Sequence, residues 1–165
     1  MSYKNYITEV PDFPEEGVNF KDISPLLANE EVFGDVIVEM RNLTHRVPDY
    51  WIGIEARGFI FASALSAYCG GGVVMCRKKG KLPPPTASHK YKTEYSEDEL
   101  EIKIGTGSVV VVDDVLATGG TLQATNDLCQ TAGYTVIDNL VLIDLLYVTR
   151  IKDFDLKIRS LIEYE

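Results

Sequence analysis

Two adjacent carboxylates and a short segment of threonines and glycines follow a run of four valines in this 165-residue chain. The valines are residues 109–112, the carboxylates are Asp113 and Asp114, and residues 118–121 read Thr-Gly-Gly-Thr. Four consecutive valines predict a fully buried strand of a parallel sheet, and such sheets bind ligands beyond the C-terminal ends of their strands. Glycines that let the backbone approach an anion, just before a helix begins, predict a phosphate site.

The two aspartates need a separate explanation, because carboxylates repel an anion bound beside them. A carboxylate can accept hydrogen bonds from two vicinal hydroxyls, so the strand, the aspartate pair and the loop together predict a site for a ribose 5-phosphate. The alternative is that Asp113 and Asp114 cap the helix or bind a metal, while the glycines only make a turn. The sequence contains neither GxxxxGK[ST] nor GxGxxG, so the nucleotide-binding loops with those patterns are excluded.

This segment resembles the signature of the phosphoribosyltransferase family, which is an apolar strand, paired acids and a loop ending in Thr-Gly-Gly-Thr. The resemblance implies a type I phosphoribosyltransferase fold and a site for 5-phosphoribosyl 1-pyrophosphate (PRPP). Asp113 and Asp114 would bind the ribose hydroxyls. The residues implied around the 5-phosphate are Ala117, Thr118, Gly119, Gly120 and Thr121.

The N-terminal segments 11–14 and 17–25 resemble the adenine-specific branch of that family. There they help to form a hood over the base. The resemblance implies that Phe20 stacks on adenine, that main-chain groups near Asn19 and Lys21 read its edge, and that Val115 covers its other face. A neutral purine needs a flat apolar surface and a few fixed polar groups. For Phe20, ordinary core packing is the alternative.

A second strand-to-helix loop, residues 53–59, resembles the pyrophosphate loop of the same branch. The chain has a net charge of −9, so an anionic substrate requires local cations. Arg57, near glycines, is one such cation. Taken alone, Arg57 is also compatible with a surface ion pair, and residues 78–81 are compatible with a solvated loop. The residues implied at pyrophosphate are Glu55, Ala56, Arg57, Arg77, Lys78 and Lys81.

Residues 89–101 resemble the mobile catalytic loop of the branch. The resemblance implies that Glu94 handles the proton of the base and that Tyr91 and Tyr95 help to close a lid. Together with Arg57, Glu94 is a predicted catalytic residue. By composition alone Glu94 would be one exposed acid among several. A flexible loop is expected over about residues 78–98.

Alternating helix and strand patterns predict an α/β fold: a mainly parallel twisted sheet flanked by helices on both faces. Predicted helices cover about residues 30–47, 59–69 and 122–132, the last ending at Gly133. Predicted strands cover about residues 51–54, 73–76, 100–104, 109–112, 135–143 and 158–164. Residues 77–92 are expected to be irregular, because they are basic and rich in proline.

Length and composition predict one domain, residues 1–165, with about residues 1–30 as the hood. No apolar run is long enough for a membrane span, and residues 1–10 are polar, unlike a secretory signal. A cytoplasmic protein is therefore expected. The excess of acidic residues argues against a general nucleic-acid-binding surface. Three cysteines without a CxxC pair are expected to be buried free thiols. His45 and His89 lack metal-ligand spacing and are expected at the surface.

The resemblance implies transfer of a phosphoribosyl group from PRPP to adenine, with Mg²⁺ carried by PRPP and no direct protein metal site. It also implies a homodimer. Two other hypotheses remain open. One is an enzyme with the same signature and another base as substrate; the other is a regulator that binds PRPP without chemistry, although such regulators normally carry a nucleic-acid-binding module.

Overall fold

The computed structural model describes residues 2–92 and 96–165. The chain forms two compact units, Met1–Glu39 and Met40–Glu165. In the first unit, strands β1 (Thr8–Val10) and β2 (Phe20–Asp22) pair in antiparallel register. The short helices η1 (Tyr3–Tyr6) and α1 (Ser24–Leu27) precede β1 and follow β2, respectively.

Helix α2 (Glu30–Leu43) begins in the first unit and ends in the second. Its apolar residues Val32, Val36 and Met40 are buried, as expected for one face of an amphipathic helix. Glutamates in the first turn suit the positive end of the helix dipole. The helix ends at Leu43, before the predicted residue 47. Just after this end, the Arg41 guanidinium donates to the Thr44 carbonyl at 3.1 Å.

The described residues of the second unit form a seven-stranded sheet in the order β5-β6-β4-β3-β7-β8-β9. Neighbours from β4 through β3, β7 and β8 to β9 are parallel, whereas β6 is antiparallel to both β4 and β5. The predicted mainly parallel sheet is therefore confirmed. The strands are β3 (Tyr50–Ile54), β4 (Gly72–Lys78), β5 (Thr86–Lys92), β6 (Glu97–Lys103), β7 (Gly107–Leu116), β8 (Tyr134–Leu145) and β9 (Arg159–Tyr164).

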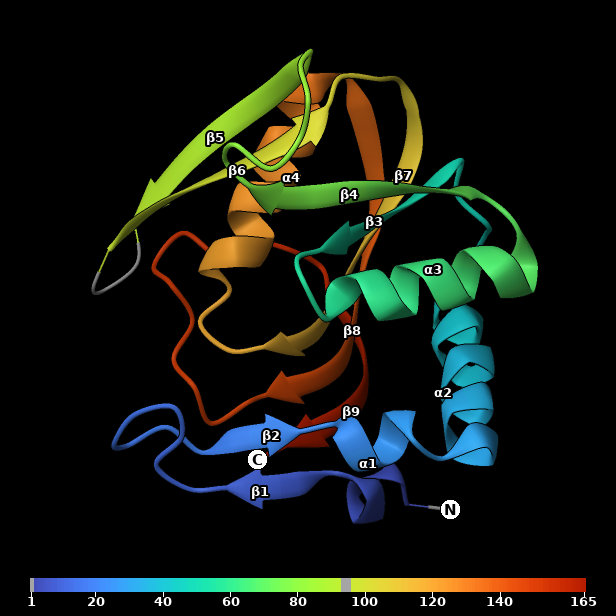
Figure 1. The fold of residues 1–165 in the computed structure, drawn as a ribbon, viewed down its shortest axis with the longest axis vertical. Helices are drawn as coiled ribbons and strands as arrows, with labels where there is room; N and C mark the ends of the chain where they lie inside the picture. The colour runs from blue at the N-terminus through green and yellow to red at the C-terminus, as the bar shows by residue number, and fades with distance from the viewer. Residues whose placement is uncertain (1, 93–95) are drawn as a thin grey trace. The chain divides into compact units, whose positions relative to one another are not determined.

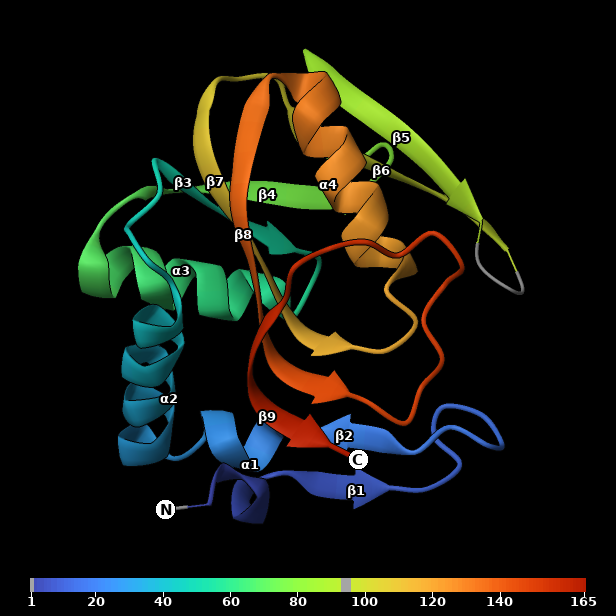
Figure 2. The ribbon, with the colours of Figure 1, turned by 180° about the vertical axis from the view of Figure 1, so that it is seen from behind.

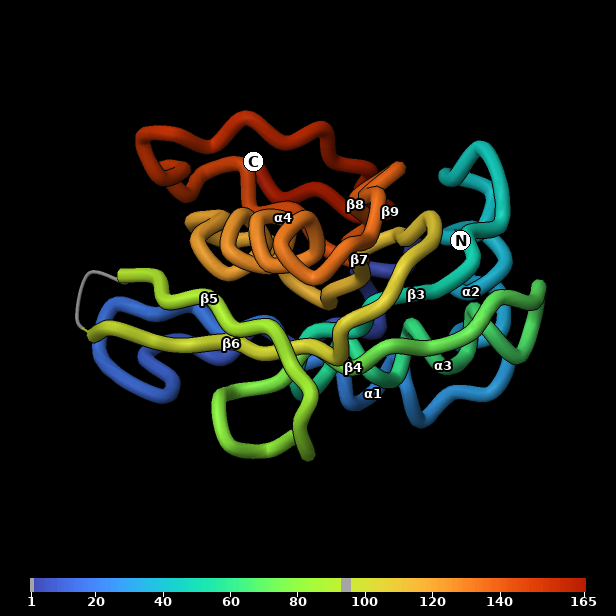
Figure 3. The backbone as a smooth tube through the Cα atoms, turned by 90° about the horizontal axis from the view of Figure 1, so that it is seen from above, coloured from blue at the N-terminus to red at the C-terminus, as the bar shows by residue number. Residues whose placement is uncertain are grey.

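Helices α3 (Gly58–Cys69) and α4 (Gly120–Ala132) lie on opposite faces of this sheet (Figures 1 and 3). Under α4, the alternate strand residues Ile52, Val109 and Val111 form one buried cluster with Leu128 of the helix. Both helices start directly after a parallel strand. The loops before α3 and α4 therefore emerge at the same edge of the sheet, which is where α/β sheets bind ligands.

The expected irregular segment 77–92 is a wrong prediction for most of its length. Strand β4 continues to Lys78, and residues 86–92 form β5, which pairs with β6. Along β5, Ala87 and Tyr91 pack against the core cluster while Ser88 and Lys90 are exposed. This is the period of two that defines a half-buried strand, but lysines at the outward positions concealed it.

Strand β7 is longer than predicted, and this changes the position of the aspartate pair. The strand continues through Asp113 and Asp114 to Leu116, because β8 remains paired to it as far as Leu116↔Asp144. The two aspartates therefore belong to a strand and not to a loop. Rigid elements hold side chains more accurately than loops do, so this placement suits a binding site.

Among residues 2–92 and 96–165, no helix combines the length and apolar character needed to cross a membrane.

Candidate active site

The aspartate pair lies at the C-terminal end of β7. Asp114 is 4% exposed and Asp113 is partly buried, with the Asp114 amide donating to the Asp113 carboxylate at 2.9 Å. Burial raises the pKa of Asp113 well above its usual range, and the neighbouring Asp114 charge raises it further. Burial also raises the pKa of Asp114, and Arg57 opposes that effect. Two carboxylates in a poorly solvated position need donors such as hydroxyls or cations.

Arg57 lies between β3 and α3 and forms an ion pair with Asp114, with Nε 2.7 Å from the carboxylate. The start of α3 approaches β7 so closely that a Cβ on Gly58 would lie 2.7 Å from the Val112 carbonyl oxygen. Only glycine fits there without displacing the backbone. The two predicted substrate loops are therefore adjacent, as their positions on a parallel sheet require.

Glu55 holds two of the predicted pyrophosphate cations, Arg77 and Lys81, in one network. Its carboxylate binds the Lys81 ammonium, accepts from the Lys78 amide at 3.0 Å and faces Arg77 Nε at 3.5 Å. Burial opposes the charge on Glu55, but these partners outweigh it and hold its pKa at about 2. Glu55 is joined to Ala56 by a cis peptide bond. Of the predicted cations, Arg77 and Lys81 lie together here, whereas Arg57 pairs with Asp114.

A cavity of about 110 Å³ lies at the loop between β7 and α4. Gly119 has a left-handed backbone, with φ of 87°, and α4 begins at the next residue. The first amides of a helix have no partner within the helix and can donate to an anion. All five predicted 5-phosphate residues line the cavity, together with Val115; the full lining is Asp113, Val115, Leu116, Ala117, Thr118, Gly119, Gly120, Thr121, Leu122 and Val141.

Tyr91, on β5, places its hydroxyl 3.3 Å from the Thr121 hydroxyl. Burial raises the pKa of Tyr91, so the phenol remains neutral and able to donate. The hairpin of β5 and β6 is thereby joined to the predicted phosphate loop. Glu94 and Tyr95, which the resemblance placed in the catalytic loop, lie outside the described residues.

In the first unit, two of the predicted base-binding residues, Asn19 and Lys21, share a partner that the sequence analysis did not identify. Glu9 on β1 accepts from the Asn19 amide at 2.8 Å and pairs with the buried Lys21 at 2.7 Å. Bonds from Lys21 and Asn19 lower the pKa of Glu9. The Phe20 ring meets the Phe13 ring edge-to-face, with centroids 5.2 Å apart. Val115 belongs to the second unit.

Arg150 was not among the predicted site residues, although its guanidinium binds the carbonyl of Ala117, a predicted 5-phosphate residue. It lies in the connection between β8 and β9, which carries no motif. A lone arginine among polar residues gives no sequence signal for such a contact. Only the course of the chain brings it to the loop.

The histidines take part in polar pairs. His89 Nε2 lies 3.8 Å from Asp127, and His45 Nε2 lies 2.6 Å from an Arg159 nitrogen. Within the part of the chain that the structure describes, no three His, Cys, Asp or Glu side chains gather so as to hold a metal ion.

Comparison with known proteins agrees with this arrangement. Residues 27–157 match the phosphoribosyl transferase domain. An adenine phosphoribosyltransferase from Bdellovibrio bacteriovorus is 47% identical, over 99% of this chain and all of that protein. The crystal structure of the enzyme of that name from Thermoanaerobacter pseudethanolicus has a TM-score of 0.91 at 41% identity, covering 98% and 97% of the two chains. A Giardia lamblia APRTase complexed with 9-deazaadenine has a TM-score of 0.89 at 33% identity, covering 100% and 99%. The chain belongs to the adenine phosphoribosyltransferases, a glycosyltransferase branch of the phosphoribosyltransferase family.

Proposed function

We propose that this chain transfers the 5-phosphoribosyl group of PRPP to adenine, forming AMP and releasing pyrophosphate, as a purine-salvage enzyme. The observation that carries the proposal is the buried aspartate pair beside the cavity of the 5-phosphate loop, with Arg57 bound to Asp114. This arrangement offers hydroxyl acceptors, phosphate donors and a cation within one site.

Phosphoribosyl transfer breaks the bond between the anomeric carbon and pyrophosphate and forms a carbon–nitrogen bond to the base. Positive charge develops on the ribose as pyrophosphate leaves, so charge placement is the main catalytic task. Asp113 and Asp114 bind the ribose hydroxyls and stabilise that charge. The amides and hydroxyls of residues 117–121 hold the 5-phosphate, which fixes the sugar while its other end reacts.

Arg57 stabilises the leaving pyrophosphate, and its ion pair with Asp114 supports this role because it holds the guanidinium beside the ribose site. Arg77, Lys78 and Lys81 add positive charge. Glu55 keeps two of them side by side, so mutual repulsion does not spread them apart. The remaining pyrophosphate contacts are assigned to the backbone at Glu55 and Ala56.

We assign adenine binding to Asn19, Phe20, Lys21 and Val115, with residues of about 1–30 as the hood. The Phe20 ring supplies a flat face, and its contact with Phe13 fixes its orientation. The Giardia relative, which binds an adenine analogue, supports the choice of base. Glu94 is assigned the proton that adenine loses, and Tyr91 and Tyr95 the closure of the lid.

The residues fit Mg²⁺ as an ion that arrives on PRPP. Mg²⁺ in enzymes is commonly held by one or two carboxylates and by substrate phosphates. Asp113 lines the cavity and Asp114 is the next residue of the strand, so these are the two carboxylates that would face an ion carried by PRPP. When bound, the ion neutralises charge on the pyrophosphate.

We further propose a homodimer that works in the cytoplasm. Ile60 and Tyr68 on α3, with Val73 and Met75 on β4, are large exposed apolar side chains, and such side chains are typical of subunit contacts. Cys69, Cys76 and Cys129 are free thiols, which supports a reducing compartment.

The test is product formation from PRPP and Mg²⁺ with adenine, hypoxanthine, guanine or uracil offered separately. Turnover of adenine alone is expected. Turnover of another base would keep the phosphate site and discard the base assignment. Absence of turnover with intact PRPP binding would identify a regulator.

A further inference from the structure

The connection between β8 and β9 runs beside the loop that joins β7 to α4 (Figure 2). From this connection, Arg150 donates to the Ala117 carbonyl, the Leu145 carbonyl and the Asp144 carboxylate; the Leu145 contact is 3.2 Å. Asp144 lies opposite Leu116, where the pairing of β8 with β7 ends. Arg150 therefore ties the start of the 5-phosphate loop to the end of the neighbouring strand.

The residues after Arg150 contact the next part of the loop. The Ile151 amide donates to the Thr118 carbonyl at 2.9 Å, and the Phe154 amide donates to the Ile151 carbonyl at 3.1 Å, which closes a turn. The Phe154 ring lies against Gly119, where a Cβ would come within 2.5 Å of ring carbons. Residues 150–154 thus contact three consecutive residues of the loop.

These contacts matter because each residue of an anion-binding loop has both a donor and an acceptor. If the amides face a phosphate, the carbonyls must find donors elsewhere, since a carbonyl beside the phosphate would repel it. Arg150 and Ile151 supply donors to two consecutive carbonyls. Among the described residues, those lining the cavity include none of 150–154, so this segment acts from outside the phosphate site.

We propose that residues 150–154 are a positioning segment for the 5-phosphate loop, and that Arg150 is the residue in it that sets the affinity for a ribose 5-phosphate. Arg150 orients the loop without touching the substrate. The inference rests on the proposed function and adds a positioning residue to it.

A selective effect on substrate affinity follows. PRPP, AMP and ribose 5-phosphate all carry the phosphate that this loop is proposed to bind, whereas adenine and pyrophosphate do not. A loss confined to the phosphate loop therefore weakens the first three ligands and leaves the affinities for adenine and pyrophosphate unchanged. A general loss of stability would not make this distinction.

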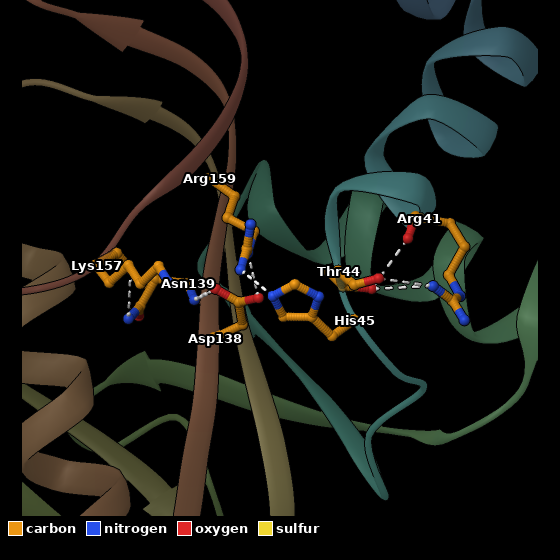
Figure 4. Close-up of polar contacts among 7 residues, drawn as sticks. All are labelled: Arg41, Thr44, His45, Asp138, Asn139, Lys157 and Arg159. Atoms are coloured by element: carbon orange, nitrogen blue, oxygen red, sulfur yellow. Dashed lines mark hydrogen bonds and ion pairs between the residues drawn. The ribbon is translucent and has the colours of Figure 1, made fainter.

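The chain offers a matched control in Arg159. Arg159 pairs with Asp138 at 2.6 Å, with side-chain exposures of 21% and 6%, close to the 22% and 11% of Arg150 and Asp144. Arg159 also contacts His45 (Figure 4). Neither Asp138 nor His45 lines the phosphate cavity. Both arginines therefore hold a buried aspartate at β8, but only Arg150 contacts the loop.

The experiment compares Arg150→Gln, Arg150→Lys and Arg159→Gln in the full chain. Calorimetry gives the affinity for ribose 5-phosphate, and kinetics gives separate KM values for PRPP and adenine. We expect Arg150→Gln to weaken ribose 5-phosphate and to raise the KM for PRPP roughly tenfold or more, with the KM for adenine unchanged. Arg150→Lys should recover part of the loss, because an ammonium reaches one of the acceptors but lacks the planar fork.

Unchanged ribose 5-phosphate affinity in Arg150→Gln would overturn the inference, as would an equal loss in Arg159→Gln. If Arg150→Gln does not fold, Phe154→Leu tests the same segment, with a smaller loss expected in the same direction and normal affinity as the contrary result. Failure of the wild-type chain to convert adenine would instead reject the proposed function, since phosphate affinity is measured without adenine.

Discussion

The two proposed substrate loops start at the same edge of one sheet but present different chemical groups. The loop between β7 and α4 offers mainly backbone donors and hydroxyls around its cavity. The loop between β3 and α3 offers Arg57, and its Glu55 holds two more cations, Arg77 of β4 and Lys81 after β4. A backbone loop is fixed in shape and suits a group that stays bound, whereas long cationic side chains can follow a group that leaves.

The largest expected effect concerns a residue that belongs to neither loop. If both loops serve binding and charge placement, the proton of adenine requires a separate acid–base group, which we assign to Glu94. Glu94→Gln should lower kcat by roughly two to four powers of ten, the usual range for such a group. Steady-state kinetics with a folding check by circular dichroism measures this. A rate near that of the wild type would remove Glu94 from the mechanism.

The next prediction tests whether the loop between β7 and α4 must keep a fixed shape. Gly119→Ala places a Cβ at φ of 87° and within 2.5 Å of the Phe154 ring, so the loop must move. A displacement of this kind should lower kcat/KM for PRPP by about a hundredfold. Gly120→Ala is the matched variant, since its Cβ would lie 3.8 Å from the Thr118 hydroxyl oxygen, an ordinary contact. Equal losses in the two variants would contradict the shape argument.

A third effect tests the point where the loops meet. Asp114→Asn removes the charge that binds Arg57 and one proposed acceptor of the ribose hydroxyls. We expect about a tenfold weaker affinity for PRPP, consistent with loss of one charged hydrogen bond. Calorimetry with PRPP measures this, and unchanged affinity would reject the ribose-binding role.

The same variant should also shift a pH profile. The Asp114 charge, after burial, is a cause of the raised pKa of Asp113, so neutralising Asp114 should lower that pKa. The loss of PRPP affinity on acidification would then occur at lower pH in Asp114→Asn than in the wild type. If the pH at which PRPP affinity is lost instead rose in Asp114→Asn, the charge of Asp114 would not be a cause of the raised pKa of Asp113.

The sequence was most informative where a motif is continuous. The segment from the valine run to Thr121 predicted a buried strand, which the structure confirms, although Asp113 and Asp114 lie in the strand itself. The phosphate loop stays a prediction, with a cavity at the predicted position. Pairing with β8 extended that strand, and pairing partners distant in sequence are not visible in a local pattern. Strand β5 was missed for a similar reason, because its pairing with β6 outweighs its polar composition.

Contacts that join distant segments could not be predicted from local patterns. Glu55 is a weak signal alone, yet it joins Lys78 and Lys81 across more than twenty residues of sequence. Arg150 reaches Ala117 in the same way. The family resemblance identified candidate residues in the proposed substrate loops. The residues that hold these loops in place could be identified only from the structure, because they come from distant segments of the chain.

The smallest expected effect concerns the Glu55 network. The pKa of Glu55 is about 2, below the usual 4.5, so folding favours the ionised form of this carboxyl group. This stability is present above pH 4.5 and is lost as the pH falls toward 2. After allowance for solvent screening, Glu55→Gln should cost about 1–2 kcal/mol of unfolding free energy at pH 7 and much less at pH 3. Denaturant unfolding at the two pH values measures the difference.

The matched control for this prediction is Glu99→Gln, which removes a glutamate that faces Lys79 at 3.6 Å from the neighbouring strand. That pair is more exposed than the contacts of Glu55, so its loss should change the free energy of unfolding less. Glu55→Gln should also raise the KM for pyrophosphate in the reverse reaction a few-fold, because Arg77 and Lys81 are no longer held together, whereas Glu99→Gln should not. If Glu55→Gln instead improved the affinity for pyrophosphate, Glu55 would compete with pyrophosphate for Arg77 and Lys81. Pyrophosphate would then have to displace the Glu55 carboxylate from these two cations in order to bind.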